Sequence, residues 1–183
     1  MRAPLSFGAR FQLSATDSIM VTRGHTPDDF ARVHSTAQAI RGYAAEWAIR
    51  ANGGYLAQAC GTAELLALLH TQVLNLGPSS AMQDPPRFAH TPQPADPGIR
   101  GEDWLGTGPD TFIISPAHYA TAQYAALVAT GRLSPVALSQ ESTDGGLLEM
   151  IGAEHSPGMA VTSGSLGIAL GVGVGRAIAR RQQ

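Results

Sequence analysis

Two short segments of the chain carry residue types that could do chemistry together. The first is Val161-Thr162-Ser163-Gly164-Ser165-Leu166-Gly167, a turn of small residues between a short apolar run and the apolar stretch 168–181. Gly164 and Gly167 lack a Cβ, so a ligand can come close to the backbone there. A helix that begins after the turn directs unpaired N–H groups and its positive dipole end at whatever lies in front. This arrangement suits a diphosphate; a turn that serves only close helix packing is the alternative.

The second segment places a histidine directly after an apolar run. Thr111-Phe112-Ile113-Ile114-Ser115 is the clearest predicted strand, and Ser115-Pro116 starts a predicted helix that Gly131 ends. His118 would then lie at the carboxyl edge of a parallel sheet, where α/β folds bind their ligands. The alternative is an ordinary exposed histidine in the first turn of a helix.

Composition narrows the class of protein. With 183 residues, 44% of them hydrophobic and 14% charged, the chain is expected to form one globular domain. A net charge of −2 and the lack of a basic run argue against nucleic-acid binding. The single cysteine, Cys60, excludes an internal disulfide and suits the cytoplasm. No secretory signal or membrane anchor is expected, and the glycines of 171–175 do not match a nucleotide-binding fingerprint.

Two helices are predicted in the first half of the chain, after an N-terminal arm at residues 1–25. Thr26-Pro27-Asp28-Asp29 is typical of a helix start, and apolar residues then recur every three or four positions until Asn52-Gly53-Gly54. After a loop at 54–61, Thr62 is expected to open a second helix that is apolar nearly all round and therefore deeply buried. His70 in this helix is interpreted as a hydrogen-bonded core histidine.

The remaining segments contain few strands. Residues 77–110 are rich in proline and are predicted to form a long surface loop, with His90 as a solvated residue. A short helix is expected at 133–140 and a doubtful second strand at 159–161. Because a buried strand needs neighbours on both sides, the sheet must be completed by another chain or by a missing segment. The predicted fold class is therefore a partial, helix-rich α/β domain at 26–183 with few parallel strands.

The spacing of these motifs resembles the N-terminal, diphosphate-binding part of the transketolase family. Ser115-Pro116-Ala117-His118 followed by Tyr124, Leu127 and Gly131 is similar to the family's Ser-x-Gly-His turn and the residues after it. Pro157 to Ala169 resembles the family's Pro-Gly-Val-Glu-x-Ser-Thr-Gly-Ser-Leu-Gly-Gln-Gly segment, and Ala51-Asn52-Gly53-Gly54 lies where the family has a Gly-His-x-Gly-Gly loop. The resemblance covers about residues 30–179.

The resemblance implies thiamine diphosphate as cofactor and transfer of a two-carbon ketol unit between sugars or related substrates. Gly164, Ser165 and Leu166 would contact the cofactor through backbone groups. His118 would stand near the diphosphate and the sugar as a hydrogen-bond donor or proton carrier. His155 would take over a substrate contact, the alternative being an ordinary loop histidine.

The chain departs from the family pattern at several positions. Tyr55 stands where the family has its first-loop histidine, Ala117 replaces a glycine, and Ile168-Ala169 replaces Gln-Gly. The family's Gly-Asp-Gly segment and the asparagine that complete the Mg²⁺ or Ca²⁺ site are not found in the sequence, so no metal ligand is assigned here. The pyrimidine-binding domain and its glutamate are also expected on another segment or chain.

Three interpretations therefore stay open. The chain is one subunit of a split transketolase-like enzyme, active in an oligomer with complementary chains. Alternatively, it is a non-catalytic fragment or regulatory subunit of such an enzyme. The third interpretation is part of a deoxyxylulose-phosphate synthase or of a dehydrogenase-type thiamine-diphosphate enzyme.

Overall fold

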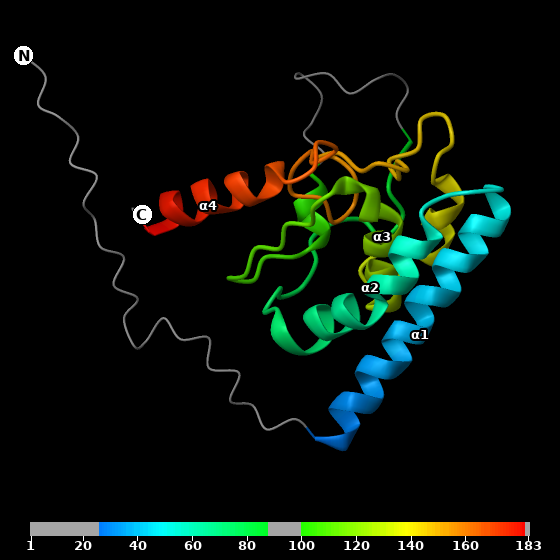
Figure 1. The fold of residues 1–183 in the computed structure, drawn as a ribbon, viewed down its shortest axis with the longest axis horizontal. Helices are drawn as coiled ribbons and strands as arrows, with labels where there is room; N and C mark the ends of the chain where they lie inside the picture. The colour runs from blue at the N-terminus through cyan, green and yellow to red at the C-terminus, as the bar shows by residue number, and fades with distance from the viewer. Residues whose placement is uncertain (1–25, 88–99, 182–183) are drawn as a thin grey trace, which may run out of the picture.

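The computed structural model describes residues 26–87 and 100–181 (Figure 1). The predicted arm at 1–25 and the prediction for His90 lie outside these ranges. The helices in chain order are α1 (Pro27–Arg50), α2 (Leu56–Leu68), the π-helical turn η1 (Leu69–Val73), the short 3₁₀ helices η2 (Gly101–Trp104) and η3 (Ala117–Tyr119), α3 (Ala120–Ala129), the 3₁₀ helix η4 (Pro135–Gln140) and α4 (Ile168–Arg181). Helices and loops make up the whole described part, which contains no β-strand.

Helix α1 begins and ends as its sequence predicts. The Asp29 N–H donates to the Thr26 hydroxyl at 3.2 Å, and the Asp29 carboxylate accepts from the Thr26 N–H at 2.9 Å. These two bonds satisfy N–H groups that the helix start would otherwise leave unpaired. Asn52 follows the helix with a φ of 51°. The predicted stripe is buried over its central part, at Ala37, Ile40, Ala44 and Trp47.

Helix α2 differs from its prediction at both its start and its burial. It begins at Leu56, so the predicted loop at 54–61 is wrong. Ala59 and Ala63 continue the three-to-four spacing of apolar residues toward the N-terminus, and both are fully buried. Burial is not all round, because Leu65 and Leu68 are 55% and 37% exposed. Helix α2 therefore has one buried face and also exposes apolar side chains to solvent.

Helices α1 and α2 pack on α3, which is the centre of the molecule (Figure 1). Every residue of α3 from Ala120 to Val128 is buried. One side of α3 meets the alanine-rich faces of α1 and α2. Its other side packs against larger residues from the loops, among them Leu76, Trp104, Leu133, Leu147 and Leu148. Small side chains thus permit close helix contact on one side of α3, and large ones fill the space on the other.

The proline-rich segment 77–110 is not only a surface loop. Trp104 and Leu105 are 3% and 4% exposed and belong to the core, which corrects the prediction for this part of the segment. The Gly108 N–H donates to the Leu76 carbonyl at 2.6 Å, so the two ends of the segment lie side by side. Arg132 donates from its guanidinium to the carbonyls of Gly77 and Leu105, which ties both ends to the turn after α3.

The predicted strand at 111–115 is not a β-strand in the structure. Residues 111–114 lead into η3 without a strand partner among the described residues, and a strand is defined by its pairing. The doubtful strand at 159–161 is not formed either. Phe112 nevertheless packs against the core and against the ring of His70, with 5.5 Å between the ring centres. Residues 111–114 are only partly buried, and no described segment pairs with them as a strand neighbour.

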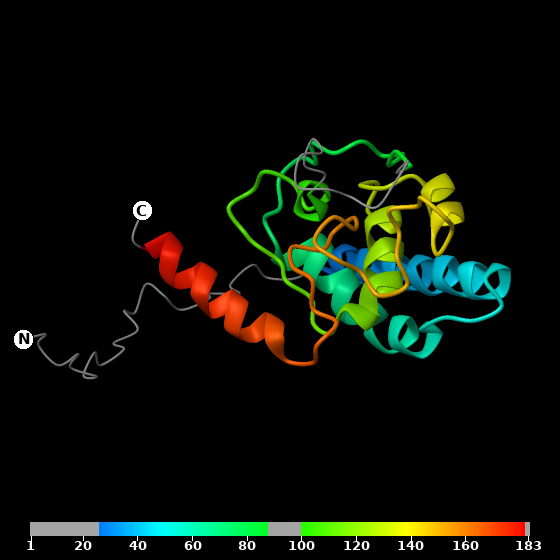
Figure 2. The ribbon, with the colours of Figure 1, turned by 90° about the horizontal axis from the view of Figure 1, so that it is seen from above.

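Helix α4 projects from the body, as the view from above shows (Figure 2). Only Ala169 of this helix is buried. On the same side, Arg176 pairs with Glu102 at 2.7 Å and Arg180 donates to the Pro109 carbonyl at 3.2 Å. The opposite side of α4 is exposed.

Candidate functional site

The predicted histidine turn and the predicted serine-glycine turn lie side by side. The Ala117 N–H donates to the Ser163 carbonyl at 3.0 Å, and the Ser163 hydroxyl donates to the Ile114 carbonyl at 2.9 Å. Ala117 and Ser163 are both fully buried, so these bonds are shielded from water. Two segments almost fifty residues apart in sequence are thereby held together.

His118 lies in η3, beside the loop that precedes α2. Its ring meets the Tyr55 ring edge to face, with 5.2 Å between the ring centres and 82° between the planes. The His118 Nδ1 atom is buried and has no hydrogen-bond partner in the structure. Buried polar atoms are normally paired, so this nitrogen is available to a ligand or an ordered water. The structure thus brings the loop that carries Tyr55 against the turn that carries His118.

Gly164, Ser165 and Leu166 form the approach to the N-terminus of α4. Gly164 is half-buried, whereas Ser165 and the Leu166 side chain are exposed. The Ser165 carbonyl accepts from the Ile168 N–H at 3.4 Å. Gly167 has a φ of 84°, which glycine adopts readily, and a Cβ built there would contact nothing. The segment therefore offers backbone groups and the positive end of a helix of 14 residues, not side chains.

His155 belongs to a different local network. Its Nε2 lies 3.3 Å from a carboxylate oxygen of Glu149, the same oxygen that accepts from the Ser156 hydroxyl at 3.2 Å. The Ser156 oxygen in turn accepts from the Ala153 N–H at 3.0 Å. These contacts orient His155 on the loop before the serine-glycine turn. The residues next to His118 and Gly164 bond to each other and so hold these two segments together. His155 contacts Glu149 instead.

Sequence reasoning missed one buried polar pair, Thr121 with Glu141, and did not identify the partner of His70. The Thr121 hydroxyl donates to Glu141 Oε1 at 2.8 Å, and burial raises the pKa of Glu141 to about 8. His70 Nε2 lies 3.3 Å from Gln123 Oε1, and burial lowers the pKa of His70 to about 4. The predicted role of His70 as a core histidine is confirmed. No feature of the sequence indicates that Glu141 is buried, because the polar residues next to it are typical of a solvated loop.

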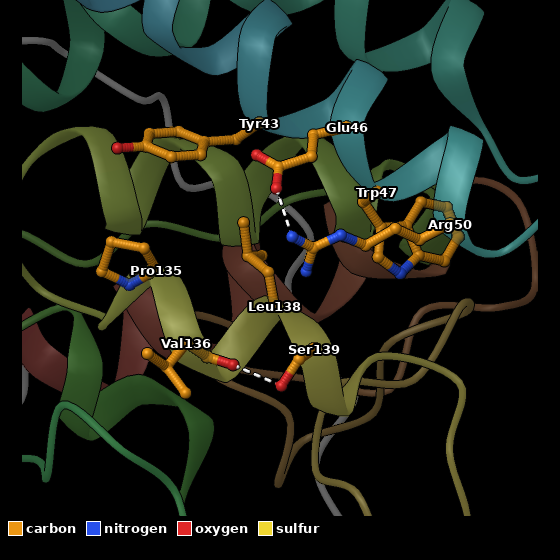
Figure 3. A pocket seen from close by; sticks show the side chains of 8 residues that line it. All are labelled: Tyr43, Glu46, Trp47, Arg50, Pro135, Val136, Leu138 and Ser139. Atoms are coloured by element: carbon orange, nitrogen blue, oxygen red, sulfur yellow. Dashed lines mark hydrogen bonds and ion pairs between the residues drawn. The ribbon is translucent and has the colours of Figure 1, made fainter.

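A cavity of about 300 Å³ lies between α1 and η4 (Figure 3). Its lining residues are Tyr43, Glu46, Trp47, Arg50, Pro135, Val136, Leu138 and Ser139. Glu46 and Arg50 form an ion pair one helical turn apart at its rim. None of the predicted site residues lines this cavity, so it is separate from the histidine and serine-glycine turns.

Residues 26–87 and 100–181 lack two other features. No group of three or more His, Cys, Asp or Glu side chains is arranged there to hold a metal ion. No helix in these ranges has the length and apolar character needed to cross a membrane.

The chain is similar to a curated protein of the transketolase family. A protein of Sinorhizobium fredii, named as an uncharacterized transketolase family protein, is 34% identical over 148 residues, which is 80% of this chain. The chain spans 45% of that relative's length. No family model matches the chain. No solved structure matches it significantly.

Proposed function

From the match to a transketolase family protein over four fifths of this chain, we propose that the chain is part of a split transketolase-like enzyme. In this proposal the residues described above form the diphosphate-binding half of a thiamine-diphosphate site. The reaction is transfer of a two-carbon ketol unit between sugars or related substrates in the cytoplasm. Other chains supply the metal ligands and the pyrimidine-binding domain.

The observation that supports the proposal is the bonded pair of turns. Ser163 accepts from the Ala117 N–H and donates to the Ile114 carbonyl, so the backbone before α4 is held against the backbone that carries His118. The helix end presents N–H groups that favour an anion, and the buried Nδ1 atom of His118 has no partner. A diphosphate would accept hydrogen bonds from the N–H groups at the helix end, and a sugar hydroxyl would pair with the Nδ1 atom of His118.

Each residue has a limited task in this scheme. Gly164, Ser165 and Leu166 hold the diphosphate through backbone N–H groups at the start of α4. His118 donates a hydrogen bond or carries a proton, and the Tyr55 ring limits the positions that the imidazole can adopt. His155, held by Glu149, orients the substrate from the neighbouring loop. When bound, thiamine diphosphate supplies the carbanion chemistry of ketol transfer, and the chain binds, orients and excludes water.

Partner chains are needed for two reasons. Residues 111–114 are apolar in part, only partly buried and without a strand neighbour among the described residues, so we propose an α/β sheet completed by another chain or segment. The described residues also offer no cluster of metal ligands, and Mg²⁺ needs oxygen ligands to bridge protein and diphosphate. The assembly we propose is an oligomer in which complementary chains provide both.

The test is binding of thiamine diphosphate by the purified complex. The chain would be co-expressed with a transketolase-like chain that carries the Gly-Asp-Gly segment, and calorimetry would measure cofactor affinity with and without Mg²⁺. His118→Ala should weaken ketol transfer at least tenfold, with a smaller effect on assembly. His34→Ala is the matched control, because His34 is an exposed histidine on α1, away from both turns.

Three results would contradict the proposal. If the complex binds no thiamine diphosphate, the chain is a non-catalytic or regulatory subunit. If His118→Ala has the activity of His34→Ala, His118 has no part in the reaction. Release of carbon dioxide from a 2-oxo acid donor would instead indicate a deoxyxylulose-phosphate synthase or a dehydrogenase-type enzyme.

A further inference from the structure

The 3₁₀ helix η2 contacts both segments that flank the serine-glycine turn. On one side, the Gly101 N–H donates to the Glu154 carbonyl at 2.7 Å, and the Gly158 N–H donates to the Gly101 carbonyl at 2.7 Å. On the other side, Glu102 pairs with Arg176 of α4 at 2.7 Å. Two neighbouring residues of η2 thus bond to the loop before the turn and to the helix after it.

The body of the protein holds η2 in place. Trp104, its last residue, is 3% exposed, belongs to the core and donates from its indole Nε1 to the Met82 carbonyl at 3.0 Å. Gly101 fits closely against the loop before the turn, because a Cβ built there would clash with the carbonyl oxygens of Ser156 and Met159. Glycine permits this close approach of two backbones. The core and the loop therefore leave η2 little freedom to move.

Helix α4, in contrast, has few contacts that hold it on the body. Ala169 is its one buried residue. The helix contains Gly171, Gly173 and Gly175, and glycine inside a helix lowers helix stability relative to alanine. An isolated helix of 14 residues is marginal in water even with better helix formers. We therefore expect α4 to stay helical only while it is docked on the body.

The ion pair with Glu102 is the charged contact that docks α4. The side chains of Glu102 and Arg176 are 21% and 33% exposed, so solvent screens this pair less than a fully exposed one. Arg100 is a second partner of the same carboxylate, which is thus held between two guanidinium groups. Hydrogen bonds between charged groups are stronger than those between neutral groups. Loss of the negative charge at Glu102 should therefore release α4 at Arg176.

The place of this ion pair decides the direction of α4. Arg176 lies eight residues after Ile168, which corresponds to about 12 Å along the helix axis. The helix is held near its start by Ala169 and further along by Arg176. Two points of attachment so far apart fix the direction of the axis. Because the N–H groups of the first turn point along the axis, the same two points fix the direction of these groups.

We propose that Glu102 is a positioning residue, which sets through Arg176 the direction of α4 and of the N–H groups that the helix presents at the serine-glycine turn. That these N–H groups bind a diphosphate rests on the proposed function, whereas the docking of α4 by Glu102 does not. In this role, Glu102 changes the affinity for the cofactor without touching it.

The first test measures amide hydrogen exchange of the full chain by mass spectrometry. Glu102→Gln keeps the size of the side chain and removes its charge. This variant should speed exchange in α4 at least about fivefold, because the released helix unfolds locally, and should leave exchange in α3 unchanged. The matched control is Glu64→Gln, since Glu64 also pairs two elements, α2 and α1, through Arg41 at 2.6 Å. This control should leave exchange in α4 at the wild-type rate.

The second test exchanges the two charges of the ion pair. A double variant with Glu102→Arg and Arg176→Glu places a carboxylate on α4 and a guanidinium on η2, so the pair forms again in the opposite sense. Exchange in α4 should return to within about twofold of the wild-type rate, whereas each single variant should resemble Glu102→Gln. Damage to the packing at either position would not be repaired in this way.

The third measurement is the affinity of the co-expressed complex for thiamine diphosphate in the presence of Mg²⁺, by calorimetry. Glu102→Gln should raise the dissociation constant at least about fivefold, because the N–H groups no longer keep one direction. The double variant should restore the affinity. Neither change should alter assembly of the complex.

The proposal is overturned if Glu102→Gln leaves exchange in α4 unchanged, if Glu64→Gln speeds it equally, or if the double variant does not restore it. If the wild-type complex binds no thiamine diphosphate, the proposed function fails, and the exchange rates alone decide whether Glu102 sets the direction of α4. If the cofactor binds but its affinity does not follow the exchange rates, Glu102 docks the helix without positioning its N–H groups, and the proposal fails.

Discussion

Glu141 provides the sharpest test of the core, because it is a buried carboxyl with half of its hydrogen-bonding capacity unused. The residue is 4% exposed, and its Oε2 atom has no partner. The Thr121 hydroxyl donates to the other oxygen at 2.8 Å. Glu141→Gln retains an oxygen for Thr121 and removes the ability to ionise. Comparing the wild-type protein with Glu141→Gln therefore measures the free energy of burying a negative charge at this position.

The direction of the pKa shift decides whether the stability contributed by Glu141 rises or falls with pH. Burial raises the pKa of Glu141 from 4.5 to about 8, so the folded protein holds a proton that the unfolded chain releases. Stability from this group is fully present below pH 4.5 and is lost as the pH rises toward 8. At about 1.4 kcal/mol per pKa unit, the loss has an upper limit of about 5 kcal/mol. Relaxation of the surroundings of the charge reduces this loss, and we expect the free energy of unfolding to fall by about 2 to 4 kcal/mol.

The assay is urea unfolding of both proteins from pH 4.5 to 9, followed by circular dichroism. At pH 5 the two free energies of unfolding should agree within about 1 kcal/mol, whereas at pH 9 Glu141→Gln should be more stable by about 2 to 4 kcal/mol. His70 contributes a separate dependence, because burial lowers its pKa from 6.5 to about 4. Stability from His70 is present above pH 6.5 and is lost as the pH falls, equally in both proteins.

Parallel pH profiles for the two proteins would refute the reasoning, since they would mean that Glu141 ionises as readily in the folded state as in the unfolded chain. If the parallel profiles were also offset, with the variant more stable by the same amount at every pH, the offset would come from packing and not from charge. Only a difference that grows with pH agrees with a buried, protonated carboxyl.

Two further predictions concern glycines and use the same unfolding assay. Gly158→Ala should destabilise the fold by about 2 to 4 kcal/mol, because φ is 76° and a Cβ would lie 2.7 Å from Gln123 Nε2. Gly131→Ala is its control, since φ is 72° with open space around it, and should cost only about 1 kcal/mol; equal losses would show that the Gln123 contact is unimportant. Gly42→Ala in the exposed interior of α1 should stabilise the protein by up to about 1 kcal/mol, and a loss of stability would contradict the open space found around Gly42.

Local signals along the chain predicted the helices well. The Thr26 cap, the apolar stripe of α1 and the stop at Asn52 depend on residues within one or two turns of each other, and the structure confirms all three. Helix α3, the short helix η4 and the start of α4 at Ile168 also follow their predictions. The start of α2 was missed because Gly61 and the glycines before Tyr55 were read as a loop. The buried alanines at 59 and 63 outweigh that local preference.

The motifs of the candidate site were readable from the sequence, but their arrangement was not. His118 and the serine-glycine turn could be singled out by residue type and spacing. Their contact depends on bonds between Ala117 and Ser163, residues almost fifty positions apart, and such long-range pairing leaves no local trace. The link from His155 to Glu149 and the unpaired Nδ1 atom of His118 are likewise tertiary facts.

The sequence by itself therefore determined where most helices begin and end, which turns carry glycine, and which family the chain resembles, because capping, periodicity and motif spacing are properties of neighbouring residues. Only the tertiary structure decided that residues 111–114 have no strand partner among the described residues, that Trp104 enters the core, that Glu141 is buried and that Gly171 and Gly175 of α4 face open space. Burial and pairing depend on which distant segments meet, and a pattern along the chain does not specify its partners.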